Sequence, residues 1–163
     1  MRQEPHHFRS GWSGLRWLLT ILAVAFVLQN IIQVWMSVPP QMVGHYAGLS
    51  WSGLSKGLIY TPLSYALLHD SGLWHFLINA IMIFIFGRAV QTRLGNIRFT
   101  EMFWFGVFLG GIVFLLTAFI TGTNAYLIGA SAGGLTILSV FCFQHWNEQI
   151  TIYLYMLVPV RLS

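Results

Sequence analysis

The sequence predicts an all-α membrane protein, a bundle of about four transmembrane helices. The 163 residues are 56% hydrophobic and only 7% charged, whereas a soluble domain carries roughly 25% charged residues. Long apolar runs also alternate with short polar or basic segments, and a membrane span needs about 20 predominantly apolar residues. The composition therefore excludes a soluble domain with one anchor. The net charge of +4 comes from few residues and does not indicate nucleic-acid binding.

The first predicted helix covers residues 17–35, which carry no formal charge. The polar and basic segment 1–16 precedes it. A cleaved signal peptide is the alternative, because the Ala-Val-Ala triplet at 23–25 resembles a cleavage site. The triplet lies in the middle of the apolar run, which favours a retained helix. Three polar side chains lie near the far end of this helix, where polarity costs less: Gln29, Asn30 and Gln33.

Proline is predicted to end the first helix at Pro39 and Pro40, because it cannot continue the hydrogen-bond ladder. Residues 41–73 then fit neither a span nor a soluble domain, since they mix Gly, Ser, Trp and Leu with one lysine. We expect short amphipathic pieces that lie in the membrane interface.

The second apolar run, residues 74–86 and extendable to residue 90, is short for a span. A basic loop is predicted after it: Arg88, Arg93 and Arg98. The third run, residues 99–120, contains Gly106 and Gly110. This Gly-x-x-x-Gly pair predicts a face for tight helix contact, because small residues let two backbones approach closely.

The fourth run, from residue 131 to about residue 143, follows a polar turn at 121–128. It is short and rich in glycine at its start, so a helix that begins below the membrane surface would place Ser131 within the bilayer thickness. The apolar stretch 150–160 is interpreted as the lead-in to another helix.

Basic residues predict the orientation, because cytoplasmic flanks of membrane helices are enriched in Lys and Arg. Arginines gather in segment 1–16 and between the second and third runs. The amino terminus is therefore expected in the cytoplasm. Four side chains then fall toward the extracytoplasmic side: Lys56, His69, His75 and Ser131.

Ser131 is a candidate nucleophile, because its small neighbours leave the clearance that a peptide carbonyl needs. His75 and Asn79 are four residues apart and share one helix face. Two donors opposite a serine are the arrangement of an oxyanion hole, which must point at the oxygen that becomes negative. Two plainer interpretations stay open: hydrogen bonds that hold the bundle together for His75 and Asn79, and the ordinary Gly, Ala and Ser content of membrane helices for Ser131.

Other chemistry has weaker support in the residues. Zinc binding by His69, Asp70 and His75 lacks a third ligand at recognisable spacing. Haem ligation by His75 and His145 would join groups expected near opposite membrane faces. Lys56 as the base of a Ser-Lys dyad lies in a loop that favours a solvated charge. An aspartyl protease needs a second aspartate, and a transporter or channel predicts polar residues at mid-depth along several helices.

Four motifs follow one another along the chain: His69-x5-His75-x3-Asn79, Phe86-Gly87-Arg88, Arg93-Leu94-Gly95 and Gly129-Ala130-Ser131. Together they resemble the rhomboid intramembrane serine proteases, from about residue 60 to residue 163. The resemblance implies a six-helix core, of which about four helices are expected here. It also implies a water-accessible cavity that opens to the extracytoplasmic side, no metal or organic cofactor, and transmembrane protein substrates within a lipid bilayer.

The resemblance implies a role for each site residue. Ser131 would be the nucleophile. His75 and Asn79, with the Ser131 backbone N–H, would form the oxyanion hole. Gly129 would keep the approach open, and His69 would support the site. Residues 17–163 would then form a rhomboid-like transmembrane domain, incomplete at its carboxyl end.

The chain departs from the family pattern in several places. The usual Gly-x-Ser-Gly has Ala132 in its last position, a glutamate after the second helix is Gln91, and the Trp-Arg pair of the first loop has no clear match. The family's general base, a histidine on the sixth helix, has no counterpart, because the chain ends before a fifth helix and His145 is the only histidine after Ser131.

A serine hydroxyl without a base is a weak nucleophile at neutral pH. The chain is therefore expected to be a fragment or a shortened form that does not cleave peptides at a useful rate. The main alternative is a non-catalytic rhomboid-like pseudoprotease that binds transmembrane clients. Retention of Ser131, His75 and Asn79 together argues against it.

Overall fold

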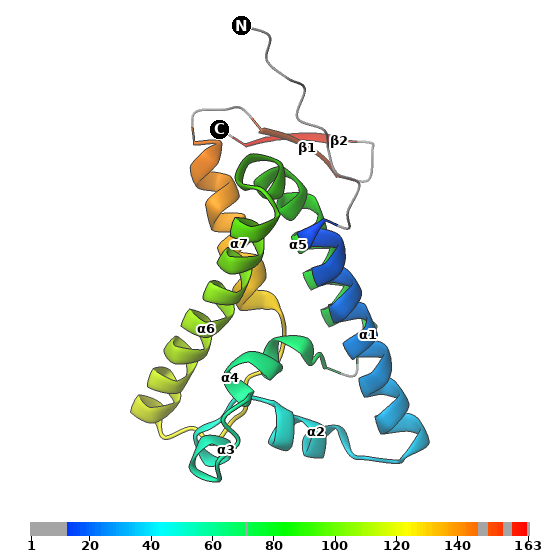
Figure 1. Ribbon diagram of the computed structural model, residues 1–163, viewed down its shortest axis with the longest axis vertical. Helices are drawn as coiled ribbons and strands as arrows, with labels where there is room; N and C mark the ends of the chain where they lie inside the picture. The colour runs from blue at the N-terminus through cyan, green and yellow to red at the C-terminus, as the bar shows by residue number, and fades with distance from the viewer. Residues whose placement is uncertain (1–12, 71, 147–149, 155–157, 163) are drawn as a thin grey trace, which may run out of the picture.

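A bundle of four helices forms the body of the protein (Figure 1). The structure, a computed structural model, describes residues 13–70, 72–146, 150–154 and 158–162. The bundle helices are α1 (Gly14–Trp35), α5 (Leu73–Leu94), α6 (Asn96–Thr121) and α7 (Ser131–Gln144). The first three are long and apolar enough to cross a membrane, and α7 is a shorter apolar helix. The predicted all-α membrane bundle is confirmed, with three full-length spans and one shorter apolar helix among the described residues.

Short helical pieces lie across one end of the bundle (Figure 1). They are α2 (Pro40–Ala47), α3 (Trp51–Ser55), α4 (Thr61–Ser64) and the 3-10 turn η1 (Tyr65–Leu67). This confirms that residues 41–73 form short pieces. The expectation that proline ends the first helix is wrong. The helix already ends at Trp35, and Pro40 opens α2, because proline needs no hydrogen-bond donor in the first turn of a helix.

A β-hairpin stands at the other end of the bundle (Figure 1). Strand β1 (Ile150–Leu154) pairs antiparallel with β2 (Val158–Leu162). These residues form strands, and that they lead into another helix stays a prediction. The segment is rich in β-branched residues, which favour strands, and Pro159 opposes a helix.

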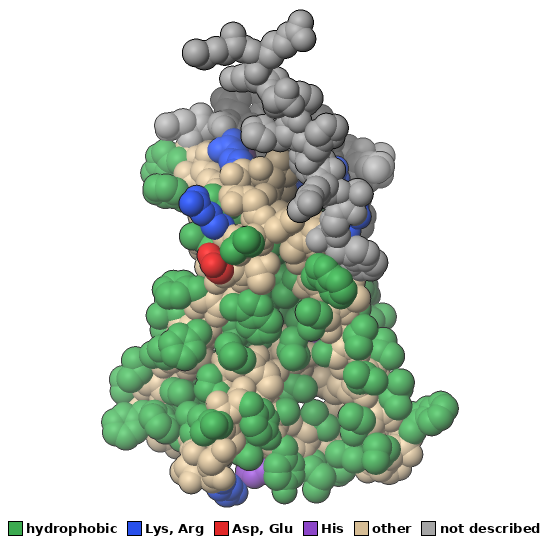
Figure 2. Space-filling view, viewed as in Figure 1, with side chains coloured by type: hydrophobic (Ala, Val, Ile, Leu, Met, Phe, Trp, Pro, Cys, Tyr) green, Lys and Arg blue, Asp and Glu red, His purple; other side chains and the backbone are tan. Residues whose placement is uncertain are grey.

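The prediction of a basic loop after the second run is also wrong, because these residues are helical. Helix α5 continues to Leu94 and α6 starts at Asn96, so Gly95 alone, with φ of +80°, forms the turn. Arg and Lys are good helix formers, and their charged heads extend to water from an apolar stem. Figure 2 shows Lys and Arg side chains gathered toward this end, while hydrophobic side chains cover most of the remaining surface.

Helices α6 and α7 meet along a seam of small residues, as the Gly-x-x-x-Gly pair predicts. A β-carbon on Gly106 would collide with Thr136, and one on Gly110 would collide with Ala132. The start of α7 is therefore level with Gly110, eleven residues before α6 ends. At 1.5 Å per residue this is about 16 Å, so Ser131 lies deep along the length of a membrane-spanning helix.

Helix α1 runs antiparallel to α5 and is attached by polar contacts at its start. The Leu15 N–H donates to Gln91 Oε1 at 2.6 Å, and the Gly14 N–H donates to Asn96 Oδ1 at 3.3 Å. These bonds satisfy N–H groups that a helix start leaves without a partner. Gln91, which stands where the family pattern has a glutamate, therefore keeps an acceptor although it lacks the charge.

Candidate functional site

The segment that leads into α7 is held by backbone hydrogen bonds to η1 and to the connection between α2 and α3. Leu49 and Leu127 exchange two bonds of 3.0 and 2.8 Å, and the Gly129 N–H donates to the Tyr65 carbonyl at 2.9 Å. Tyr65 is itself buried, and its hydroxyl donates to the Val107 carbonyl of α6 at 2.6 Å. The predicted helix start at Ser131 is confirmed, and its position is fixed from both sides.

Gly129 brings Ser131 and His75 together. A β-carbon built on Gly129 would lie 2.9 Å from His75 Nε2 and 3.9 Å from Ser131 Oγ. The imidazole from the start of α5 and the hydroxyl from the start of α7 therefore border one small space, which a side chain at position 129 would fill. Gly129 also has φ of +112°, a conformation that L-residues rarely adopt.

A hydrogen bond to Nδ1 of His75 determines the tautomer of the ring, and so whether Nε2 is a donor. The Asp70 backbone N–H donates to His75 Nδ1 at 3.3 Å. A neutral imidazole has one donor and one acceptor nitrogen, so an accepting Nδ1 places the proton on Nε2. The group beside Ser131 is then an N–H donor, which suits the stabilisation of a negative oxygen rather than proton abstraction from the serine.

Asn79 lies one turn after His75 on α5 and is 3% exposed. Its side-chain amide donates to the His75 carbonyl at 2.9 Å. A primary amide carries two N–H groups, and this bond uses one of them. This bond stays within α5, so it is not an interhelical bond that holds the bundle together. That the second N–H serves an oxyanion hole stays a prediction.

Helix α7 contributes backbone donors. The first N–H groups of a helix have no intrahelical acceptor, and their partial positive charge favours anions. In α7 the first helical bond is donated by Gly134 to the Ala130 carbonyl. The Ser131 N–H precedes it, next to the hydroxyl of the same residue.

His69 is completely buried behind His75. The two ring centroids are 5.3 Å apart, and the aromatic rings of Phe26 and Phe76 also pack edge-on against His69. Neither ring nitrogen of His69 has a hydrogen-bond partner. Burial, with a smaller contribution from His75, lowers the pKa of His69 to about 4, and the Leu67 backbone opposes this shift. The ring is therefore neutral at physiological pH.

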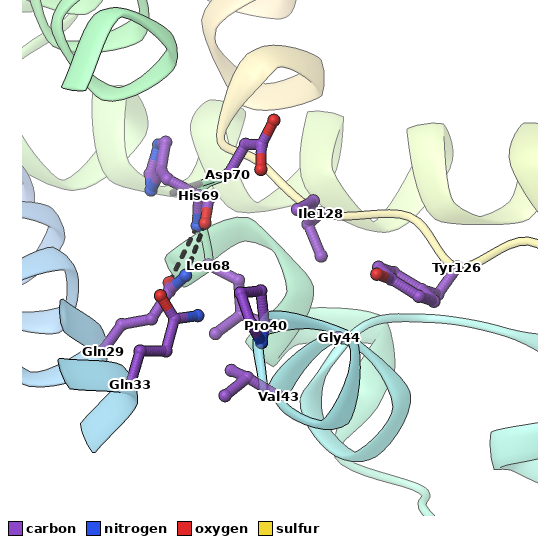
Figure 3. A pocket seen from close by; sticks show the side chains of 10 residues that line it. All are labelled: Gln29, Gln33, Pro40, Val43, Gly44, Leu68, His69, Asp70, Tyr126 and Ile128. Atoms are coloured by element: carbon purple, nitrogen blue, oxygen red, sulfur yellow. Dashed lines mark hydrogen bonds between the residues drawn. The ribbon is translucent and has the colours of Figure 1, made fainter. Parts of the chain in front are cut away.

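Gln29 of α1 holds the main chain of His69, a contact that sequence reasoning missed. The Gln29 side chain accepts from the His69 N–H at 3.0 Å and donates to the His69 carbonyl. Figure 3 shows this pair beside a cavity of about 30 Å³, which Gln33, Asp70 and other residues also line. The volume suits a water molecule or two. An uncharged polar residue inside an apolar run was the available signal.

The zinc candidates His69, Asp70 and His75 lie close to one another, but not in an arrangement of metal ligands. No group of three His, Cys, Asp or Glu able to hold a metal occurs among the described residues. His145 follows the last turn of α7, fourteen residues and about 21 Å of helix rise from Ser131. Lys56 is exposed, and its Nζ lies 3.5 Å from His45 Nε2, which fits the interpretation of a surface charge.

Comparison with protein families matches the Rhomboid domain to residues 56–162. The matched segment includes α4, η1, α5, α6, α7 and the hairpin, and so contains every candidate residue of the site. The comparison with curated proteins finds no match.

Proposed function

Because the chain belongs to the rhomboid family, we propose that it supplies the nucleophile and the oxyanion hole of an intramembrane serine endopeptidase that cleaves transmembrane proteins. The observation that carries this proposal is the space beside Gly129. Ser131 Oγ and a donating His75 Nε2 border it from two different helices.

In the proposed mechanism Ser131 Oγ attacks the carbonyl carbon of an extended substrate segment. The carbonyl oxygen becomes negative, and it accepts hydrogen bonds from His75 Nε2, the Asn79 amide and the Ser131 N–H. Such donors act when charge develops, and removing one typically costs about 10²–10³ in kcat. The serine proton must pass to a base and then to the leaving amine. Neither His75, with its donating Nε2, nor the distant His145 serves as this base, so residues 1–163 alone are expected to be inactive.

The chain is an integral membrane protein, and we further propose its orientation. The basic end, where α5 passes into α6, would face the cytoplasm together with the amino-terminal segment 1–16. Most of that segment, residues 1–12, lies outside the described residues. Residues 17–163 would form the rhomboid-like domain, although α1 already starts at Gly14. The site would then open to the extracytoplasmic side.

The test compares two proteins in liposomes with a single-span reporter substrate: residues 1–163, and the product of the coding region read past Ser163. We expect cleavage only by the longer product, loss of cleavage in Ser131→Ala, and a decrease of about 10²–10³ in kcat in His75→Ala. Cleavage by residues 1–163 that Ser131→Ala abolishes would show that the base is within them, against the proposal.

A non-catalytic client-binding protein is the second candidate, and the remote position of His145 favours it. It predicts that the longer product cross-links to single-span clients without cleaving them. It also predicts that Ser131→Ala leaves the cross-linking yield unchanged. Cleavage by the longer product would exclude it.

A further inference from the structure

We propose that Gln29 is a positioning residue that sets the tautomer of His75 through the backbone of residues 69 and 70. This inference rests on the proposed function, because it concerns the donor that His75 offers to the oxyanion. It assigns a role to a residue of α1, which lies outside the matched family segment of residues 56–162.

The first step is the contact between Gln29 and His69. Gln29 is 6% exposed, and its amide satisfies both the N–H and the carbonyl of His69. A buried polar group without a partner costs about 1–3 kcal/mol, so both groups favour the clamped arrangement. The His69 main chain is thereby tied to a membrane-spanning helix.

The second step runs along the chain to the next residue. Asp70 directly follows the clamped residue, and its N–H donates to His75 Nδ1. The direction of this N–H depends on the peptide plane between His69 and Asp70. That plane includes the same His69 carbonyl that accepts from Gln29. The clamp therefore fixes the orientation of the donor that holds Nδ1 unprotonated.

The third step is the result at the site. With Nδ1 accepting, the proton of the neutral ring is on Nε2, which faces the space beside Gly129 and Ser131. Without the clamp the His69–Asp70 peptide can rotate, and the Nδ1–H tautomer becomes accessible. In that tautomer Nε2 presents a lone pair to the oxyanion and repels it.

The test uses nitrogen-15 NMR of the full chain, labelled at histidine and reconstituted in lipid, at a pH above the ordinary range of imidazole titration. Gln29→Met keeps the side-chain length and removes both hydrogen bonds. Gln33→Met is the matched control, because Gln33 lies one turn later and lines the same cavity. A His75→Gln spectrum identifies the His75 signals.

We expect Gln29→Met to lower the ratio of the Nε2–H to the Nδ1–H tautomer of His75 by roughly two- to fivefold. This change corresponds to the net free energy of one long hydrogen bond. Gln33→Met should leave the ratio unchanged. If Gln29→Met fails to fold, Gln29→Asn replaces it, since this amide is polar but one methylene too short to hold both main-chain groups of His69.

An unchanged tautomer ratio in a folded Gln29 variant would overturn the inference and reduce Gln29 to a structural contact, even if its thermal stability fell. An equal change in Gln33→Met would overturn it as well. The measurement needs no proteolysis, so a failed cleavage assay would refute the proposed function and leave this result unaffected.

Discussion

Replacing Gly129 with alanine tests whether the space between His75 and Ser131 has to stay empty. Two effects add at this position. The first is backbone strain, because φ is +112° and an L-residue held in such a sparsely populated conformation costs about 1–3 kcal/mol. The second is a collision, because the new β-carbon would lie 2.9 Å from His75 Nε2. Overpacking of this kind typically costs about 1–3 kcal/mol.

Gly122→Ala is the control for backbone strain. Gly122 also has a positive φ, +67°, but a β-carbon there would meet nothing within 4 Å. It therefore reports the strain of a left-handed conformation without a collision, about 1–2 kcal/mol. Gly129→Ala should destabilise the protein by about 2–6 kcal/mol, the sum of the two effects. Its excess over Gly122→Ala contains the collision with His75 together with the greater strain at φ of +112°.

The assay is equilibrium unfolding of the purified protein in detergent, together with the nitrogen-15 spectrum of His75. Gly129→Ala should shift the His75 signals, and Gly122→Ala should leave them in place. Equal destabilisation of both variants, with unmoved His75 signals, would refute the arrangement of Gly129, His75 and Ser131 described above.

Two further predictions concern stability. Because the folded state disfavours the charged form of His69, unfolded chains bind more protons between the ordinary pKa of 6.5 and the folded pKa of about 4. The free energy of unfolding should therefore fall by up to about 3 kcal/mol as pH decreases through this window. The same fall in a His69→Leu variant, measured by unfolding, would contradict the assignment to His69. Gly106→Ala should destabilise the protein at the seam between α6 and α7 by about 1–3 kcal/mol in the same assay. Gly72→Ala should cost little, because a β-carbon there meets nothing within 4 Å. Equal destabilisation by the two variants would argue against the seam.

The sequence was most informative where one physical requirement dominates. Apolar length predicted the spans, and small residues predicted the close contact between α6 and α7 at Gly106 and Gly110. The start of the last bundle helix at Ser131 could also be predicted. In each case the deciding factor is local: hydrophobic length, steric clearance or the end of a polar turn.

The sequence was misleading where a residue type suits two structures. Arg88 and Arg93 suggested a loop, yet both belong to α5, because an arginine at a helix end reaches water without ending the helix. The contact of Gln29 could not be predicted either. Its position near the end of an apolar run suggested a group that water satisfies, whereas its partners are main-chain atoms forty residues later.

The attachment of α1 at two depths has a consequence for how the protein assembles. The hydrophobic effect does not select one rotation of a helix within the bilayer, because neighbouring helices and acyl chains are equally apolar. Leu15 and Gln29, about 21 Å apart along the helix, bind partners in segments that leave the ribosome much later. Helix α1 must therefore remain free to turn and slide in the bilayer until α5 follows it.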